Sequence, residues 1–227
     1  MGLTQSEAAR FIKTHCRLET PVHVPEIRLW TAGPTDPIWA GDGRAFETLS
    51  LLEPFWAFAW SGGQAIARYL LDHPAKVRGR RVLDLASGGG VSAIAAAKAG
   101  ARSVCAVDID PMAPVAIRLN AAANGVAIDA RLGDALTLLS AERLNDATLV
   151  LAGDVFFDAT LASAFIQAFD DAKGAGAEIL VGDPGRSYFP KDAFEHLALY
   201  ETAPKTGLQD AELRRASVWR FRQGRFR

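Results

Sequence analysis

The chain of 227 residues is 49% hydrophobic and 22% charged, and its 25 basic and 26 acidic residues leave a net charge of −1. This apolar mass is sufficient for a sizeable core, which excludes disorder along the whole chain. The balanced charge also argues against a domain that binds nucleic acid through bulk electrostatics, because such domains are strongly basic.

The N-terminal region predicts a short helix followed by an irregular arm. Thr4 and Glu7 have the spacing of a capping box at the start of a helix over 4–13. Seven prolines and glycines lie between Pro21 and Gly43, and this density favours irregular structure. We therefore divide the chain into a helical and irregular extension over 1–53 and a main domain over 54–227.

The main domain begins with an aromatic segment over 54–60, and Ser-Gly-Gly-Gln then leads into a helix over 65–73. Beyond it, short apolar runs predict strands over 81–85, 103–107, 130–132, 148–151 and 178–181. Helices are expected between them, over 91–99, 111–124, 135–144 and 161–173. Two last strands, over 198–201 and 217–221, are expected to pair antiparallel at one sheet edge. Strands separated by helices predict an α/β fold with a doubly wound, mostly parallel seven-stranded sheet.

A glycine-rich loop follows the first strand of this sheet. Gly88, Gly89 and Gly90 connect the strand directly to a helix. Glycines let the backbone approach a ligand closely, and the start of the helix offers free N–H groups. The spacing fits a loop that binds a dinucleotide pyrophosphate, although glycines in an α/β loop are weak evidence alone.

Acidic residues follow at the ends of three successive strands, at Asp84, Asp108 and Asp134. A carboxylate at Asp108 can accept hydrogen bonds from both hydroxyls of a ribose, and Asp134 can meet an adenine amino group. Ligands of open α/β sheets bind at the carboxyl ends of the strands. The three acids together therefore predict a nucleoside-binding edge.

The pattern Asp84-x-Ala86-x-Gly88-x-Gly90, followed by Asp108 and Gly133-Asp134, resembles the cofactor site of seven-strand class I S-adenosylmethionine-dependent methyltransferases. The usual family pattern has glycine at the position of Ala86, so the backbone dihedral there is in question. The segments 55–64, 108–113, 153–158 and 182–186 resemble protein-lysine methyltransferases of the electron transfer flavoprotein β-subunit type. The resemblance implies that S-adenosyl-L-methionine is the cofactor. The cofactor-binding residues that it implies are Trp60, Asp84, Ala86, Ser87, Gly88, Gly90, Asp108, Ile109, Asp134 and Gly153.

The segment from Asp154 to Phe157 resembles the Asp-x-x-(Tyr/Phe) motif of the lysine-methylating branch. A lysine ammonium, with a pKa of about 10.4, must lose its proton before it can attack a methyl group. We expect Asp154 to accept a hydrogen bond from the incoming amine and to orient it. Phe157 is expected to line an apolar channel for the lysine stem, and its neighbour Phe156 to point into the core.

Two further sets of charged residues can each be interpreted in two ways. Asp183 and Arg186 either shape the substrate entrance or make a turn with an ion pair. The last fourteen residues carry six arginines and no acid. Those at Arg220 and Arg222 belong either to a solvated edge strand or to a basic docking surface for an acidic protein substrate.

The resemblance implies a protein-lysine N-methyltransferase whose substrate is the electron transfer flavoprotein β-subunit, with the ribosomal stalk protein as a second candidate. A small-molecule amine N-methyltransferase on the same fold is an alternative. An NAD(P)-dependent oxidoreductase is a weaker one, since the chain has no Tyr-x-x-x-Lys pair.

The sequence also bears on metal binding, on binding partners and on the cellular compartment. The four histidines and two cysteines lack metal-ligand spacing, so no metal is expected. No apolar run approaches the length of about 20 residues that spans a bilayer. We expect a monomer with no nucleic-acid or membrane partner. The N-terminus shows no transit signal, which favours a cytoplasmic enzyme of bacterial type.

Overall fold

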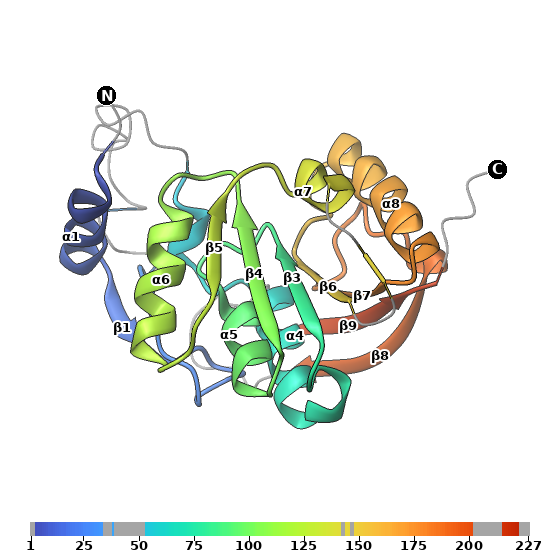
Figure 1. Cartoon of the computed structure of the whole chain (residues 1–227), viewed down its shortest axis with the longest axis horizontal. Coiled ribbons are helices and arrows are strands. Elements are labelled where there is room, and N and C mark those ends of the chain that lie inside the picture. The colour runs from blue at the N-terminus through green and yellow to red at the C-terminus, as the bar shows by residue number, and fades with distance from the viewer. Residues whose placement is uncertain are drawn as a thin grey trace.

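A seven-stranded sheet with helices on both faces organises the fold (Figure 1). The computed structural model describes residues 3–33, 38, 53–141, 144–145, 148–201 and 215–222. The strand order is β5-β4-β3-β6-β7-β9-β8. This confirms the predicted doubly wound, mostly parallel sheet.

The first five strands of this sheet are parallel, and the last two run antiparallel to their neighbours. The strands are β3 (Arg81–Leu85), β4 (Ser103–Asp108), β5 (Asp129–Leu132), β6 (Thr148–Gly153), β7 (Glu178–Asp183), β8 (Phe194–Glu201) and β9 (Arg215–Phe221). The order of the sheet reverses at β3, which pairs with β4 on one side and β6 on the other. Such a switch point opens a crevice at the carboxyl ends of the strands.

Alternate residues of the strands face two separate hydrophobic cores. Leu83 and Val150 pack on one face against α7 (Ala135–Ala141) and α8 (Ala159–Gly174). Val82 and Leu149 pack on the other face. The helices there are α4 (Ser61–Asp72), α5 (Val91–Lys98) and α6 (Ala113–Ala123). Because side chains alternate along a strand, these uninterrupted apolar runs can fill both cores.

The N-terminal extension packs against α6. It contains α1 (Gln5–His15), whose capping box is present, and an antiparallel pair of strands, β1 (Arg17–Glu19) and β2 (Leu29–Thr31). The backbone N–H of Trp30 donates to Asn120 Oδ1 at 2.7 Å, and Asn124 Nδ2 donates to the carbonyl of Arg28 at 2.6 Å. The prediction of a wholly irregular arm is therefore wrong at 29–31, since side chains of α6 fix this strand. Much of the predicted arm, 34–37 and 39–43, lies outside the described residues.

Helix α4 begins at Ser61, four residues before the expected start, so that boundary is corrected. A Cβ on Gly62 would lie 2.3 Å from the carbonyl oxygen of Gly182, and one on Gly182 would lie 2.0 Å from that of Gly62. Only glycine at both positions lets the helix backbone touch the ends of β6 and β7. This contact outweighs the poor helix propensity of glycine.

Several other strand and helix boundaries also differ from the expectation by one to four residues, and two of them have a clear physical reason. Strand β8 begins at Phe194 rather than at 198, because its first residues pair with the end of β9. Helix α8 begins at Ala159, where the Asp158 carboxylate accepts from the Leu161 N–H and caps the helix. Over the part of the chain that the structure describes, no helix has the length and apolarity needed to span a membrane.

Candidate functional site

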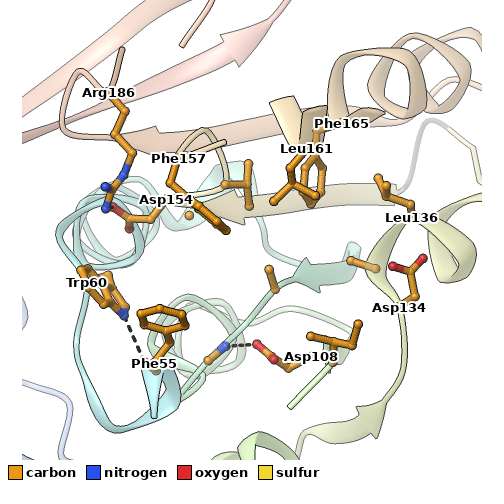
Figure 2. Close-up of a pocket in the computed structure, with 16 residues that line it drawn as sticks. Phe55, Trp60, Asp108, Asp134, Leu136, Asp154, Phe157, Leu161, Phe165 and Arg186 are labelled. Carbon is orange, nitrogen blue, oxygen red and sulfur yellow. Dashed lines mark hydrogen bonds and ion pairs between the residues drawn. The ribbon is translucent and has the colours of Figure 1, made fainter. Parts of the chain in front are cut away.

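A cavity of about 460 Å³ opens at the carboxyl ends of β3, β4 and β6 (Figure 2). The predicted site residues that line it are Trp60, Ala86, Gly88, Asp108, Ile109, Asp134, Gly153, Asp154 and Phe157. Asp84 and Ser87 line a smaller neighbouring cavity of about 40 Å³. Gly90 lines neither of these cavities; it is the N-cap residue of α5, with a φ of 83°.

The cavity has two chemically different ends, both visible in Figure 2. We call the part around Asp108, Asp134 and Leu136 the Asp108 end. The part around Asp154, Arg186 and Trp60 is the Asp154 end. The Asp108 end presents two carboxylates beside an apolar side chain, whereas the Asp154 end presents a carboxylate beside a cation and an aromatic ring. The cavity can therefore hold a ligand with a polar group at one end and a second molecule at the other.

The loop after β3 is held by the carboxylate of Asp84. This side chain is 2% exposed and accepts hydrogen bonds from the Ser87 hydroxyl and from the Ala93 N–H, the latter at 3.2 Å. Burial raises the pKa of Asp84 to about 7, although both hydrogen bonds act in the opposite direction. Asp84 therefore ties the loop to the first turn of α5.

Three left-handed residues turn the strand into the helix. Ala86, Gly88 and Gly90 have φ angles of 48°, 53° and 83°. A left-handed conformation costs a residue with a Cβ about 1–2 kcal/mol, and glycine avoids this cost. The question about the dihedral at Ala86 is thereby answered, since this alanine adopts the conformation that glycine favours.

Asp108 is fixed by backbone donors at the end of β4. The N–H of Gly88 donates to Oδ2 at 2.8 Å and the N–H of Asp110 donates to Oδ1 at 3.0 Å. Burial raises the pKa of this carboxyl group, and these same donors lower it. Each carboxylate oxygen accepts a second hydrogen bond through its remaining lone pair. Asp108 is thus suited to bind two neighbouring hydroxyl groups.

The rest of the Asp108 end has a polar rim and an apolar surface. Asp134 caps α7 by accepting from the Thr137 N–H at 2.6 Å. Ile109 is 65% exposed beside it, which is high for a large aliphatic side chain. Ile109 and Leu136 line the cavity together, so a flat aromatic ring fits between apolar faces here.

Asp154 lies directly after β6 with a φ of 60° and is 9% exposed. Its Oδ2 accepts from the Gly63 N–H at 3.1 Å, and its Oδ1 lies 3.4 Å from Arg186 Nη2. Burial raises the pKa of Asp154 to about 6; the Arg186 cation and the Gly63 hydrogen bond lower it, and nearby Asp183 raises it. The carboxylate is therefore ionised near neutral pH and aimed into the cavity.

Aromatic side chains form the walls near Asp154. Phe157 is 58% exposed and lines the cavity, whereas Phe156 is fully buried against the rings of Phe189 and Phe194. Trp60 Nε1 donates to the carbonyl of Phe55 at 3.0 Å. The two adjacent phenylalanines thus divide as expected, one to the cavity and one to the core.

Several site residues were not found from the sequence. Phe55 lines the cavity from the aromatic segment and is 49% exposed. Asn120, fully buried on α6, donates to the carbonyl of Gly89 at 2.8 Å and so links the glycine loop to β2. No local pattern marks a buried asparagine in a helix, whereas the aromatic run 55–60 does signal a wall of this kind.

The arginines at the C-terminal edge are paired within the sheet. Arg220 contacts the Glu195 carboxylate across the β8–β9 pair, and Arg222 Nε lies 3.6 Å from the same group. Arg215 pairs with Glu201 at 3.0 Å. These contacts favour the solvated edge strand, and the docking surface stays a prediction. Arg214, Arg225 and Arg227 lie outside the described residues.

The residues of the cavity fit S-adenosylmethionine. A carboxylate with spare lone pairs suits a ribose, apolar Ile109 and Leu136 suit an adenine, and the Gly88 backbone lines the space between the two ends. The cavity volume lies within the range of small-molecule sites, about 300–1,000 Å³. Within the described ranges, no three His, Cys, Asp or Glu side chains gather into a metal-binding cluster.

Comparisons with known proteins point to methyl transfer. The family model "Ribosomal protein L11 methyltransferase (PrmA)" matches residues 66–175. The chain is 36% identical over 201 residues to the electron transfer flavoprotein beta subunit lysine methyltransferase of Mus musculus, covering 87% of this chain and 77% of that protein. The identically named protein of Xenopus laevis is 37% identical over 216 residues, covering 93% and 85%.

A solved structure agrees with the fold. The magnesium protoporphyrin IX methyltransferase of Synechocystis PCC 6803, solved with bound SAM, superposes with a TM-score of 0.51 at 17% identity. The match covers 71% of this chain and 79% of that one. At this identity the likeness concerns the fold alone.

Proposed function

Since this chain belongs to the electron transfer flavoprotein beta subunit lysine methyltransferase family, we propose that its acceptor is a lysine ε-amine of that flavoprotein subunit. The chain is an S-adenosylmethionine-dependent protein-lysine N-methyltransferase. One observation carries the proposal for the site. A buried, ionisable carboxylate, Asp154, lies at one end of a cavity whose other end suits a nucleoside.

The Asp108 end would hold the cofactor. Asp108 would accept hydrogen bonds from the two ribose hydroxyls, while Ile109 and Leu136 contact the adenine. Asp134 would accept from the adenine amino group. When bound, S-adenosylmethionine supplies a methyl group on a sulfonium, which an amine attacks in line.

The Asp154 end would receive the lysine. The carboxylate of Asp154 accepts a hydrogen bond from the ε-amine and thereby sets the direction of its lone pair toward the Asp108 end. Phe157 and Phe55 surround the aliphatic stem and exclude water from the reacting atoms. An aromatic face also attracts the cationic form of the amine during entry. The proton that the ammonium loses leaves before attack, and Asp154, ionised near pH 7, can accept it transiently.

Two other acceptors are weighed against this one. The L11 family model covers residues 66–175, a range that includes both Asp108 and Asp154, so it supports a protein methyltransferase site without favouring the flavoprotein subunit. The ribosomal stalk protein therefore stays a second candidate. A small-molecule amine is an alternative, but the relatives are named for a protein substrate. A monomeric, cytoplasmic enzyme stays a prediction.

The proposal is tested by incubating the pure protein with heavy-methyl cofactor and with two acceptors together, purified electron transfer flavoprotein and ribosomal protein L11. We expect heavy methyl groups on lysines of the flavoprotein β-subunit, detected by peptide mass spectrometry. The matched control is Asp154→Ala, which should leave the peptides unlabelled. Label on L11 alone would replace the first candidate by the second, and label on neither protein would overturn the proposal.

A further inference from the structure

Arg186 lines the cavity and extends from the loop after β7 toward Asp154 and Trp60 (Figure 2). The base of this loop is fixed, because Asp183 Oδ1 accepts from the N–H groups of Gly185 at 2.6 Å and Arg186 at 2.8 Å. The guanidinium, in contrast, has two partners. Its Nη2 lies 3.4 Å from Asp154 Oδ1, and its Cζ lies 5.8 Å from the centroid of the Trp60 ring.

The position of this guanidinium conflicts with the entry of a lysine. Asp154 is 9% exposed and lines the cavity, so an amine held in the cavity can reach its carboxylate. Gly63 donates to Oδ2 and Arg186 contacts Oδ1, so an incoming ammonium would share this one carboxylate with the guanidinium. Two cations beside one buried carboxylate repel each other, which favours the departure of one when the other binds.

We propose that Arg186 is a positioning residue that serves as an exchangeable counter-cation of Asp154. It holds the carboxylate ionised and oriented before the acceptor binds, and it moves onto Trp60 when the substrate amine takes its place. This inference rests on the proposed function, since it needs an amine as acceptor.

The contacts of Arg186 suit such an exchange. A distance of 3.4 Å is at the long limit of a hydrogen bond, so the pair is held mainly by charge, which an incoming ammonium can replace. The Trp60 ring offers the guanidinium a second favourable position on its face. The Gly63 N–H stays on Oδ2 throughout, and therefore the carboxylate keeps its orientation during the exchange.

The charges around Asp154 explain why a resident cation is needed. Asp183, at the end of β7, is 1% exposed, and its Oδ2 has no hydrogen-bond partner among the residues described. Asp84 lines the same small cavity as Asp154. From α4 the only favourable group facing the carboxylate in these contacts is the Gly63 N–H. With Arg186 removed, burial and the negative charge of Asp183 would favour the protonated form of Asp154.

The test measures kcat/KM for methyl transfer across pH, for Arg186→Gln and for the wild type, with the protein that the wild type is found to methylate. The ratio of the two kcat/KM values cancels the titration of the substrate lysine itself. If the pKa of Asp154 rises by one unit in the variant, this ratio should increase about fivefold from pH 6 to pH 9. Arg186→Lys keeps a cation and should restore a flatter ratio. A ratio that is constant or falls with pH would overturn the proposal.

The matched control is Arg80→Gln. Arg80 is 18% exposed and pairs with Glu178 at 2.6 Å, so it resembles Arg186 in burial and pairing but lies at the opposite end of the sheet. Its ratio to the wild type should not change with pH. A dependence equal to that of Arg186→Gln would assign the effect to general destabilisation and overturn the proposal.

A second measurement is independent of the acceptor. In a thermal-unfolding cycle of Asp154→Asn and Arg186→Gln, the shifts in Tm should be non-additive at pH 8 and additive at pH 4, where Asp154 is protonated. Additivity at pH 8 would refute the pairing even if the protein methylates lysine. Non-additivity without any lysine methylation would instead leave the pair intact and remove the proposed function.

Discussion

At the Asp108 end of the cavity, both carboxylate oxygens accept from backbone N–H groups, those of Gly88 and Asp110. At the Asp154 end, one oxygen accepts from the backbone of Gly63, and the other faces the side chain of Arg186. A backbone donor keeps its place as long as the fold does, whereas a long side chain can leave at small cost. The Asp108 end is therefore prearranged for a constant ligand, and the Asp154 end for one that arrives and departs.

Both ends also contain a non-glycine residue in the left-handed region, but for different reasons. At Ala86 the side chain contributes only a methyl group to the site, whereas at Asp154 it contributes the carboxylate. Replacement by glycine would relieve the strain at Ala86 without removing a reactive group, whereas at Asp154 it would also remove the carboxylate. Substitutions at the two ends should therefore separate binding from transfer.

The largest effect is expected from Asp154→Ala. Loss of the group that orients the amine should reduce methyl transfer by about 10²–10⁴-fold, the range for removal of a positioned acid–base group. Affinity for S-adenosylhomocysteine should stay unchanged, because the Asp108 end is untouched. Calorimetry and labelled-methyl incorporation measure the two quantities. Full activity in this variant would remove Asp154 from the mechanism.

Asp108→Ala should produce the opposite pattern. Two charge-assisted hydrogen bonds to a ribose would be lost, which should weaken binding of S-adenosylhomocysteine by about 10- to 100-fold in calorimetry. The matched control is Asp129→Ala, an exposed acid at the start of β5 that pairs with Arg131. Equal affinities of the wild type and Asp108→Ala would refute the ribose contact.

Gly62→Ala tests whether the close approach of α4 orients Asp154. The new Cβ would lie 2.3 Å from the Gly182 carbonyl oxygen and 2.5 Å from Asp154 Oδ2, so the helix must shift and carry the Gly63 N–H with it. We expect a loss of about 1–3 kcal/mol in stability, with transfer reduced more than cofactor binding. Thermal unfolding and both activity assays measure this. Gly174→Ala, with open space around it at the end of α8, is the control and should stabilise the protein by about 0.4–1 kcal/mol.

Asp154→Asn should make the protein more stable at pH 8. Burial raises the pKa of Asp154 to about 6, above its value in the unfolded chain, so the folded state holds the proton more tightly. The protonated carboxyl group of Asp154 contributes its whole stabilisation below the pKa that it has in the unfolded chain, and this contribution is lost as the pH rises through 6. Removing this group should raise the free energy of unfolding by about 1 kcal/mol at pH 8 and leave it unchanged at pH 4. Unfolding at both pH values tests the sign, and a larger gain at pH 4 would contradict it.

The smallest effect is expected from Ala86→Gly. Relief of the left-handed strain and the extra entropy of glycine in the unfolded chain nearly cancel, so stability should change by less than about 1 kcal/mol. Cofactor affinity should be retained. A marked loss of stability would show that the Ala86 methyl group is needed for packing.

The sheet was largely predictable because its strands are continuous apolar runs between turn residues. The strand over 81–85 was predicted to the residue, and the acids at Asp108 and Asp134 were predicted at one edge because parallel strands end together. The short strand β2 was missed, since prolines flank it and its order depends on Asn120 and Asn124 far along the chain.

The Asp154 end was less predictable, and the reason is physical. The contact of Gly62 with Gly182 and the contact of Arg186 with Asp154 join segments that are distant in sequence. Such pairs leave no local periodicity. The motif placed Asp154 and Phe157 at the site, but only the fold brings α4 and the loop after β7 onto that carboxylate.

The central claim is that one end of the cavity binds the cofactor and the other handles the acceptor. The most direct test is methyl transfer by Asp108→Ala and Asp154→Ala, measured side by side at saturating S-adenosylmethionine. Excess cofactor should restore transfer in Asp108→Ala, because its defect is one of affinity, and should leave Asp154→Ala inactive. Restoration of both variants, or of neither, would contradict this division of the site.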